Sequence, residues 1–161
     1  MADAATPNGR GALHPDRLHA LGLLAYQAGN YRAAVDIISL AIRFRDNVAA
    51  YHCDLGLVLQ CQGHVAEAAA QYRRALALDP RHAATHTNLA RLLQAQGQQT
   101  AAVFHFKRAL EYRPNDALIH NNLGIALLEQ GRSAEAESQF RNAMALDPDH
   151  ADTHHNLGNS L

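Results

Sequence analysis

The chain has 161 residues, of which 48% are hydrophobic and 18% charged, and its formal net charge is −1. This balance argues against nucleic acid as a partner, because nucleic-acid-binding domains usually carry a strongly basic face. No apolar stretch approaches the ~18 residues of a membrane-spanning helix, so we expect no membrane partner either. The single lysine, Lys107, and the heavy use of alanine indicate a bacterial source with GC-rich coding.

Residues 1–14 are rich in alanine and glycine and lack the apolar run of a secretory signal. They are predicted to form a flexible N-terminal segment. Two cysteines, Cys53 and Cys61, lie on one predicted helix, where eight residues of rise separate their Cα atoms by ~12 Å. A disulfide needs less than about 7 Å. Both should therefore be free thiols, which favours a cytoplasmic location.

From residue 15 onward the sequence repeats every 34 residues without an insertion. The period is marked by prolines and glycines at fixed spacing, namely Pro80, Pro114 and Pro148, and Gly29, Gly63, Gly97 and Gly131. A repeat of this length is typical of stacked helix pairs rather than of one catalytic domain. It divides the chain into copies at 15–48, 49–82, 83–116 and 117–150, with a partial fifth copy at 151–161.

Each copy predicts two amphipathic helices, helix A over about positions 1–14 and helix B over about positions 17–30. In helix A, apolar residues at positions 7 and 11 share one face, and a small residue at position 8 lets helix B approach closely. In helix B, alanines at positions 20 and 27 flank a large side chain at position 24: Ile38, Tyr72, Phe106 or Phe140. Glycine at position 15 suits the turn between the helices, and proline at position 32 ends helix B.

This pattern resembles the tetratricopeptide repeat (TPR) family. The signature positions are all met in the second, third and fourth copies, while the first departs at Asp46, in place of proline, and at the small Ala25. The resemblance implies an all-α, right-handed superhelical solenoid of antiparallel helix pairs, with helices A lining a concave groove that binds a protein or peptide. No nucleophile–base pair or phosphate-binding loop is apparent, so we expect no enzyme activity and no cofactor in these residues.

Position 6 of helix A carries the most informative groove residues: Ala20, Asp54, Asn88, Asn122 and Asn156. An amide both donates and accepts, so it can pair with both sides of a peptide unit. Helices spaced by roughly 10 Å would let one asparagine per repeat hold every third residue of an extended peptide, which advances ~3.3 Å per residue. The candidate groove residues are Asn88, Asn122, Asn156, Asp54, Arg91, Thr87 and Asn121. The alternative is that the asparagines were copied by duplication and bond to a neighbouring helix or to water.

The segments HTNLARLLQAQGQ and HNNLGIALLEQGR also resemble the repeats of O-linked N-acetylglucosamine transferases. That resemblance implies a second function, in which this chain is the amino-terminal substrate-recognition arm of a larger bacterial glycosyltransferase. The chemistry would then lie beyond Leu161.

Histidine recurs at position 4, as His52, His86, His120 and His154. Metal ligands must lie ~2 Å from one ion, and repeats spaced by roughly 10 Å cannot bring these side chains together. We therefore predict no metal site and expect the histidines to pack against the preceding helix B.

The sequence stops inside helix A of the fifth copy, which leaves Leu157 and Leu161 without a following helix B. Solenoids usually close with a polar capping helix. A third function is therefore a structural one, in which this end mediates self-association of the solenoid.

Overall fold

The computed structural model describes residues 14–149 and 151–160, and within these ranges all regular structure is helical. In chain order the helices are α1 (Pro15–Gln27), α2 (Tyr31–Phe44), α3 (Ala49–Cys61), α4 (Val65–Leu78), α5 (Ala83–Ala95), α6 (Gln99–Tyr112), α7 (Ala117–Leu128), α8 (Ser133–Leu146) and α9 (Ala151–Ser160). Odd-numbered helices are helices A, and even-numbered helices are helices B. Residues 1–13 of the predicted flexible segment lie outside the described residues, while His14 is the N-cap of α1.

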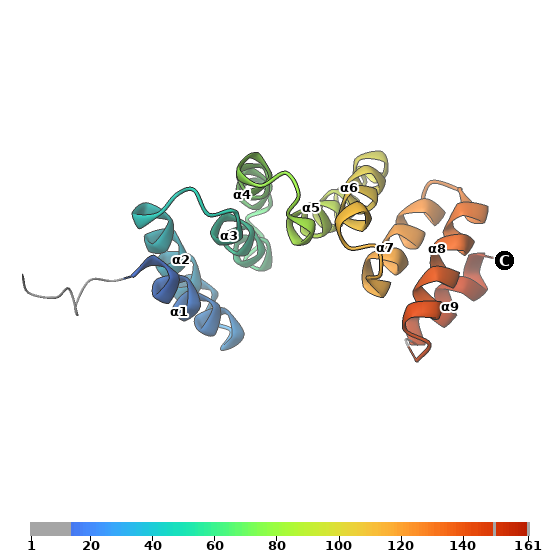
Figure 1. Ribbon diagram of the computed structural model, residues 1–161, viewed down its shortest axis with the longest axis horizontal. Coiled ribbons are helices and arrows are strands. Elements are labelled where there is room, and N and C mark those ends of the chain that lie inside the picture. The colour runs from blue at the N-terminus through green and yellow to red at the C-terminus, as the bar shows by residue number, and fades with distance from the viewer. Residues whose placement is uncertain (1–13, 150, 161) are drawn as a thin grey trace, which may run out of the picture.

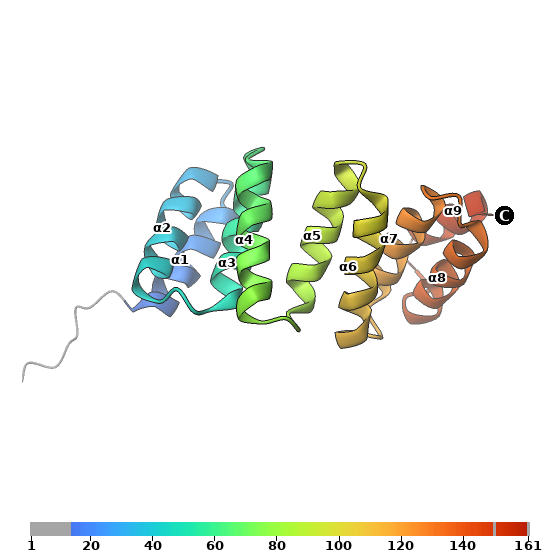
Figure 2. The same cartoon turned by 90° about the horizontal axis from the view of Figure 1, so that it is seen from above.

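The helices form a solenoid in which each helix packs against the next one along the chain. Helices A also contact one another from repeat to repeat, α1 with α3, α3 with α5, and onward to α9. Figure 1 shows the result as an arch, with α4 and α6 on its outer side and α3 and α5 on its inner side. Figure 2, turned by 90°, shows the helices side by side in one row along the molecule. The predicted all-α solenoid is confirmed.

The core follows the small–large–small pattern of helix B. The four large side chains at position 24 are all fully buried, and so are the alanines on either side of them; the large ones are Ile38, Tyr72, Phe106 and Phe140. They press on position 8 of helix A, where a Cβ on Gly56 would lie 2.7 Å from a ring carbon of Tyr72. Glycine is therefore required there by close approach, as the sequence predicts.

The turns between helices A and B are set by the recurring glycine at position 15. These glycines have φ between 73° and 79°, which L side chains rarely adopt: Gly29, Gly63, Gly97 and Gly131. Helix A of the fourth repeat starts at a capping carboxylate, because Asp116 Oδ1 accepts a hydrogen bond from the backbone N–H of Ile119 at 3.2 Å. The glycine turns thus end each helix A of the complete repeats, and a side-chain cap starts α2, α5 and α7.

The histidines at position 4 join three segments of the chain. The Nε2 of His52, His86 and His120 lies 2.9, 3.1 and 2.9 Å from the carbonyl oxygens of Asp46, Pro80 and Pro114. The Nδ1 of each lies 2.8 to 2.9 Å from the position-23 side chain of its own helix B, which is Gln71, His105 or Gln139. The acceptor is a backbone carbonyl oxygen, which every residue has, so Asp46 can stand in place of proline without loss of this contact. The side chain of His154 lies outside the described part.

The third repeat differs because its histidine meets another histidine. Since His86 Nε2 donates to the carbonyl of Pro80, the Nδ1 of neutral His86 accepts, and His105 Nδ1 must donate across 2.9 Å. Burial lowers the pKa of both rings, that of His105 to about 4. Two protonated imidazoles cannot keep this contact, so the third repeat depends on a neutral pair.

The two ends of the solenoid differ from the expected burial. Leu21 is at position 7 and was expected in the core, but it is 51% exposed, and Leu24 beside it is 59% exposed. The reason is that no described helix precedes α1 to cover this face. At the other end Leu157 is half-buried and packs against the core, although no described helix B follows it. Leu161 lies outside the described residues, so self-association through this end stays a prediction.

Replacing Gly124 by alanine should destabilise the fold. The new Cβ would lie 2.5 Å from Cε1 of the fully buried Phe140. Overpacking of this kind costs ~1–3 kcal/mol, which outweighs the gain in helix propensity, so we expect a net loss of ~1 kcal/mol in urea unfolding. Gly158→Ala is the matched control, because nothing lies within 4 Å of its Cβ position. A Gly124→Ala variant as stable as the control would contradict the packing argument.

The free energy of unfolding should fall as the pH drops from about 6.5 towards 4. In this window the unfolded chain binds protons that the folded His86–His105 pair excludes, because both folded-state pKa values are lowered. His105→Gln supplies the amide found at Gln71 and Gln139, and should reduce the loss between pH 7 and pH 4.5 by about 1–2 kcal/mol. Urea titrations of both proteins at the two pH values test this, and an equal pH dependence would refute it.

Candidate binding groove

Polar contacts link the helices A along the inner side of the arch with one regular offset. Each joins a residue to the residue 35 further along, which is one repeat of 34 plus one position. The pairs are Asp16–Tyr51, His19–Asp54 at 2.8 Å, Tyr26–Cys61 at 4.0 Å, Cys53–Asn88 at 3.7 Å, Asn121–Asn156 at 3.1 Å and Gln94–Glu129 at 2.8 Å. Neighbouring helices A are therefore staggered by one residue.

Two of the three predicted asparagines take part in these stacking contacts. The Nδ2 of Asn88 donates to Sγ of Cys53, and the Nδ2 of Asn156 donates to Oδ1 of Asn121. Asn121, which the sequence placed in the groove, is only 5% exposed. Asp54 accepts a hydrogen bond from His19 of the chain itself rather than from the backbone N–H of a ligand. Much of the predicted ladder thus holds adjacent helices together.

Asn122 breaks this pattern. Its partner at the same offset would be Thr87, but the Thr87 hydroxyl donates to the carbonyl of Ala83 in its own helix at 3.1 Å. Within the described ranges the half-buried side chain of Asn122 makes no hydrogen bond. Its whole amide is therefore free to bind something else.

The structure brings Asn88 and Arg91 together in one pocket on the inner side. This pocket has a volume of about 270 Å³ and is lined by residues of α1, α3 and α5: Tyr26, Leu57, Gln60, Cys61, Asn88 and Arg91. Asn122, on α7, lies outside it. Arg91 is exposed and forms no ion pair with any described carboxylate. The pocket is a small cleft with an unpaired cation among its lining residues.

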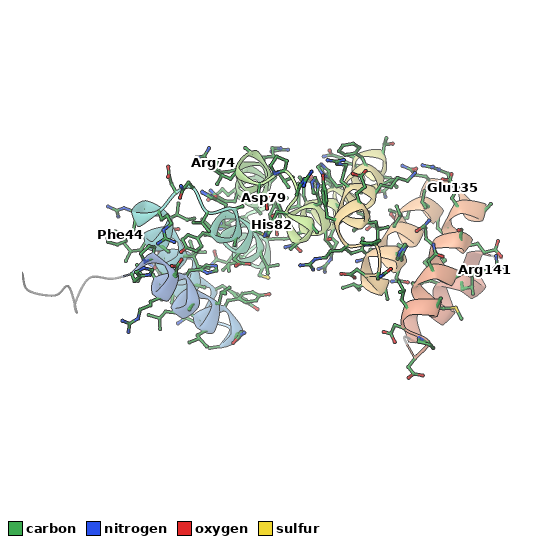
Figure 3. The ribbon with its side chains drawn as sticks, viewed as in Figure 1. Phe44, Arg74, Asp79, His82, Glu135 and Arg141 are labelled. Atoms are coloured by element: carbon green, nitrogen blue, oxygen red, sulfur yellow. The ribbon has the colours of Figure 1, made fainter. Side chains whose placement is uncertain are left out.

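Some charges on the outer side of the arch form ion pairs, whereas Arg91 forms none with a described residue. Figure 3 shows Arg74 on α4 and Glu135 on α8 on this side. Arg74 lies 3.9 Å from a carboxylate oxygen of Asp46, and Arg132 forms two contacts of 2.7 Å with Glu135. Such exposed pairs contribute little stability.

Tyr26 and Cys61 were not among the residues predicted for the groove. They occupy positions 12 and 13, which the repeat already places on the inner side, so the register alone could have identified them. Burial raises the pKa of Tyr26, and its hydroxyl therefore keeps its proton at neutral pH. Both cysteines are free thiols, as predicted. Cys61 is exposed and Cys53 is buried, and burial raises the pKa of Cys53.

The described residues were searched for a metal-binding cluster and for a membrane-spanning helix. Within 14–149 and 151–160, no three histidine, cysteine or carboxylate side chains gather closely enough to hold a metal ion. Over the same residues, no helix combines the length and the apolar character that crossing a membrane would require.

Comparison with known sequences identifies the repeat. Residues 49–82 and 117–150 match a model of the tetratricopeptide repeat, and residues 71–104 and 90–131 match two further models of TPR repeats. Together these matches cover residues 49–150 without a gap. The search of curated proteins found no match.

Solved structures share the fold over most of the chain. PilF of Pseudomonas aeruginosa is 26% identical, with a TM-score of 0.86 over 91% of this chain and 67% of that one. MamA is 16% identical, with a TM-score of 0.81 over 91% and 80% of the two chains. YrrB, described as a TPR protein with an unusual peptide-binding site, is 24% identical, with a TM-score of 0.76 over 89% and 74%.

The likeness to MamA and YrrB shows the fold alone at these identities. None of these comparisons supports the more specific resemblance to the repeats of O-linked N-acetylglucosamine transferases. The 34-residue period, the stacked helix pairs and the matching repeat models agree with one another. The chain belongs to the tetratricopeptide-repeat family.

Proposed function

We propose that this chain is a non-catalytic interaction module whose inner groove binds an extended segment of a partner protein. The observation that carries the proposal is the pair of unsatisfied polar groups on the inner side, the amide of Asn122 and the guanidinium of Arg91. Elsewhere on this side, polar side chains bond across neighbouring helices. Groups left without a partner on such a surface are suited to an external ligand.

The relatives support a role in binding. YrrB, which shares the fold, has a peptide-binding site. The pocket of about 270 Å³ beside Arg91 is smaller than most sites for drug-sized molecules, and it accommodates one side chain of a peptide. A main chain that runs along helices A would place successive side chains against successive repeats.

The contacts of the groove residues assign them different roles in this proposal. Asn122 pairs with the main chain of the ligand, because an amide can serve both its N–H and its C=O. Arg91 and Asn88 contact a ligand side chain in the pocket. Asp54, Thr87, Asn121 and Asn156 position the helices through their contacts within the chain.

A photo-crosslinking side chain placed on the inner side should capture the partner. We expect a benzoylphenylalanine at Leu57, in the pocket, to form crosslinks in a lysate of the source organism, and mass spectrometry to map them to one continuous partner segment. The matched control places the same group at Phe104, which is 58% exposed on α6. Crosslinks from Phe104 alone would contradict a groove-binding function.

Asn122→Ala should weaken capture of that segment without lowering stability. The change removes no hydrogen bond within the described chain, and a hydrogen bond lost to the ligand weakens binding by ~1 kcal/mol, or about fivefold. Asn156→Ala, which removes a stacking contact, should lower stability instead. Both variants are checked by thermal unfolding and by titration of the captured segment as a synthetic peptide. Equal affinity of Asn122→Ala and the wild type would exclude Asn122 from the site.

A further inference from the structure

The pocket on the inner side offers donors rather than acceptors. The carbonyl oxygen of Gln60 already accepts a hydrogen bond from the Tyr72 hydroxyl at 2.9 Å, which leaves the N–H groups of Gln60 for a ligand. The oxygen of Tyr26 is the acceptor for the Cys61 thiol at 4.0 Å, so the Tyr26 proton remains to be donated. One N–H of Asn88 goes to Cys53, and the other is unused.

The charge of the pocket also favours a ligand group that accepts hydrogen bonds, and in particular an anion. Arg91 is its one charged lining residue, and no carboxylate lines it. Asp54, which lies on α3 with Leu57 and Gln60, is paired with His19 at 2.8 Å. A guanidinium with several hydrogen-bond donors around it matches a planar anion with two oxygens.

We propose that this pocket takes the carboxylate of an aspartate or glutamate side chain of the bound segment. The inference rests on the proposed function, since it names the side chain that the groove selects. Arg91 pairs with the carboxylate, Tyr26 and Gln60 donate to it, and Leu57 covers the methylene groups of the side chain. The row of helices A continues past the pocket to α7 and α9. The ligand chain therefore crosses the pocket and continues along these helices, and its end does not lie in the pocket.

A peptide library with one fixed residue tests the selectivity on the full chain. The probes are ten-residue peptides, acetylated and amidated, with mixed flanking positions and a central Glu, Asp, Gln or Lys. We expect the Glu and Asp pools to bind at least fivefold more protein than the Gln pool, and the Lys pool to bind least. The preference should shrink as salt is raised, because an exposed ion pair is screened.

Substitutions of two different arginines distinguish binding in the pocket from a general effect of positive charge. Arg91→Gln should bring the Glu and Asp pools down to the Gln level, while Arg91→Lys should keep part of the preference. Arg81→Gln is the matched control, since Arg81 is an exposed arginine that lies outside the pocket and forms no ion pair with a described residue. Circular dichroism confirms that each variant is folded.

Three results would overturn the inference. They are equal binding of the Glu and Gln pools by the wild type, an unchanged preference in Arg91→Gln, and stronger binding of a central-Gln pool with a free carboxyl terminus than of the amidated Glu pool. If Leu57 still captures a partner segment, only the carboxylate assignment fails and the groove function stands. If no pool binds and Leu57 forms no crosslink, both fail together.

Discussion

The structure depends on one contact, repeated in every complete helix pair: a large side chain of helix B pressed onto a small residue of helix A. The four large side chains at position 24 are completely buried, and three of them face a glycine at position 8. This contact brings the backbones of helix A and helix B close together and fixes the position of one helix relative to the other. Because every pair is built alike, the next pair stacks in the same way, and the arch and its inner groove follow from the repetition.

The stacking between pairs is fixed by polar contacts with their own regularity. Histidine at position 4 ties the turn before helix A to helix B of the same repeat, through a backbone carbonyl and a side chain. Contacts at an offset of 35 residues tie each helix A to the next. A buried ring with both nitrogens bonded has one orientation, so these contacts add specificity to a core made of interchangeable apolar residues.

The sequence was sufficient for the architecture and insufficient for the site. Periodicity predicts the helices, the glycine turns and the buried residues at position 24, because each follows from spacing along one chain. The partner of Asn88 could not be predicted in this way. An amide at position 6 can bond to a ligand or to Cys53, and the choice depends on the stagger between helices, which no single repeat encodes. The pattern predicts that Leu21 is buried, but burial at position 7 requires a preceding helix, and Leu21 is exposed.

The free amide of Asn122 lies where the repeat is irregular. Position 5 carries His19, Cys53, Thr87 and Asn121 in successive repeats, and three of them bond to position 6 of the next repeat. Threonine is the exception, because its short hydroxyl reaches the carbonyl four residues back in its own helix. That one substitution releases Asn122 from stacking. In the proposed function, the positions at which stacking leaves a polar group free are those that bind the partner.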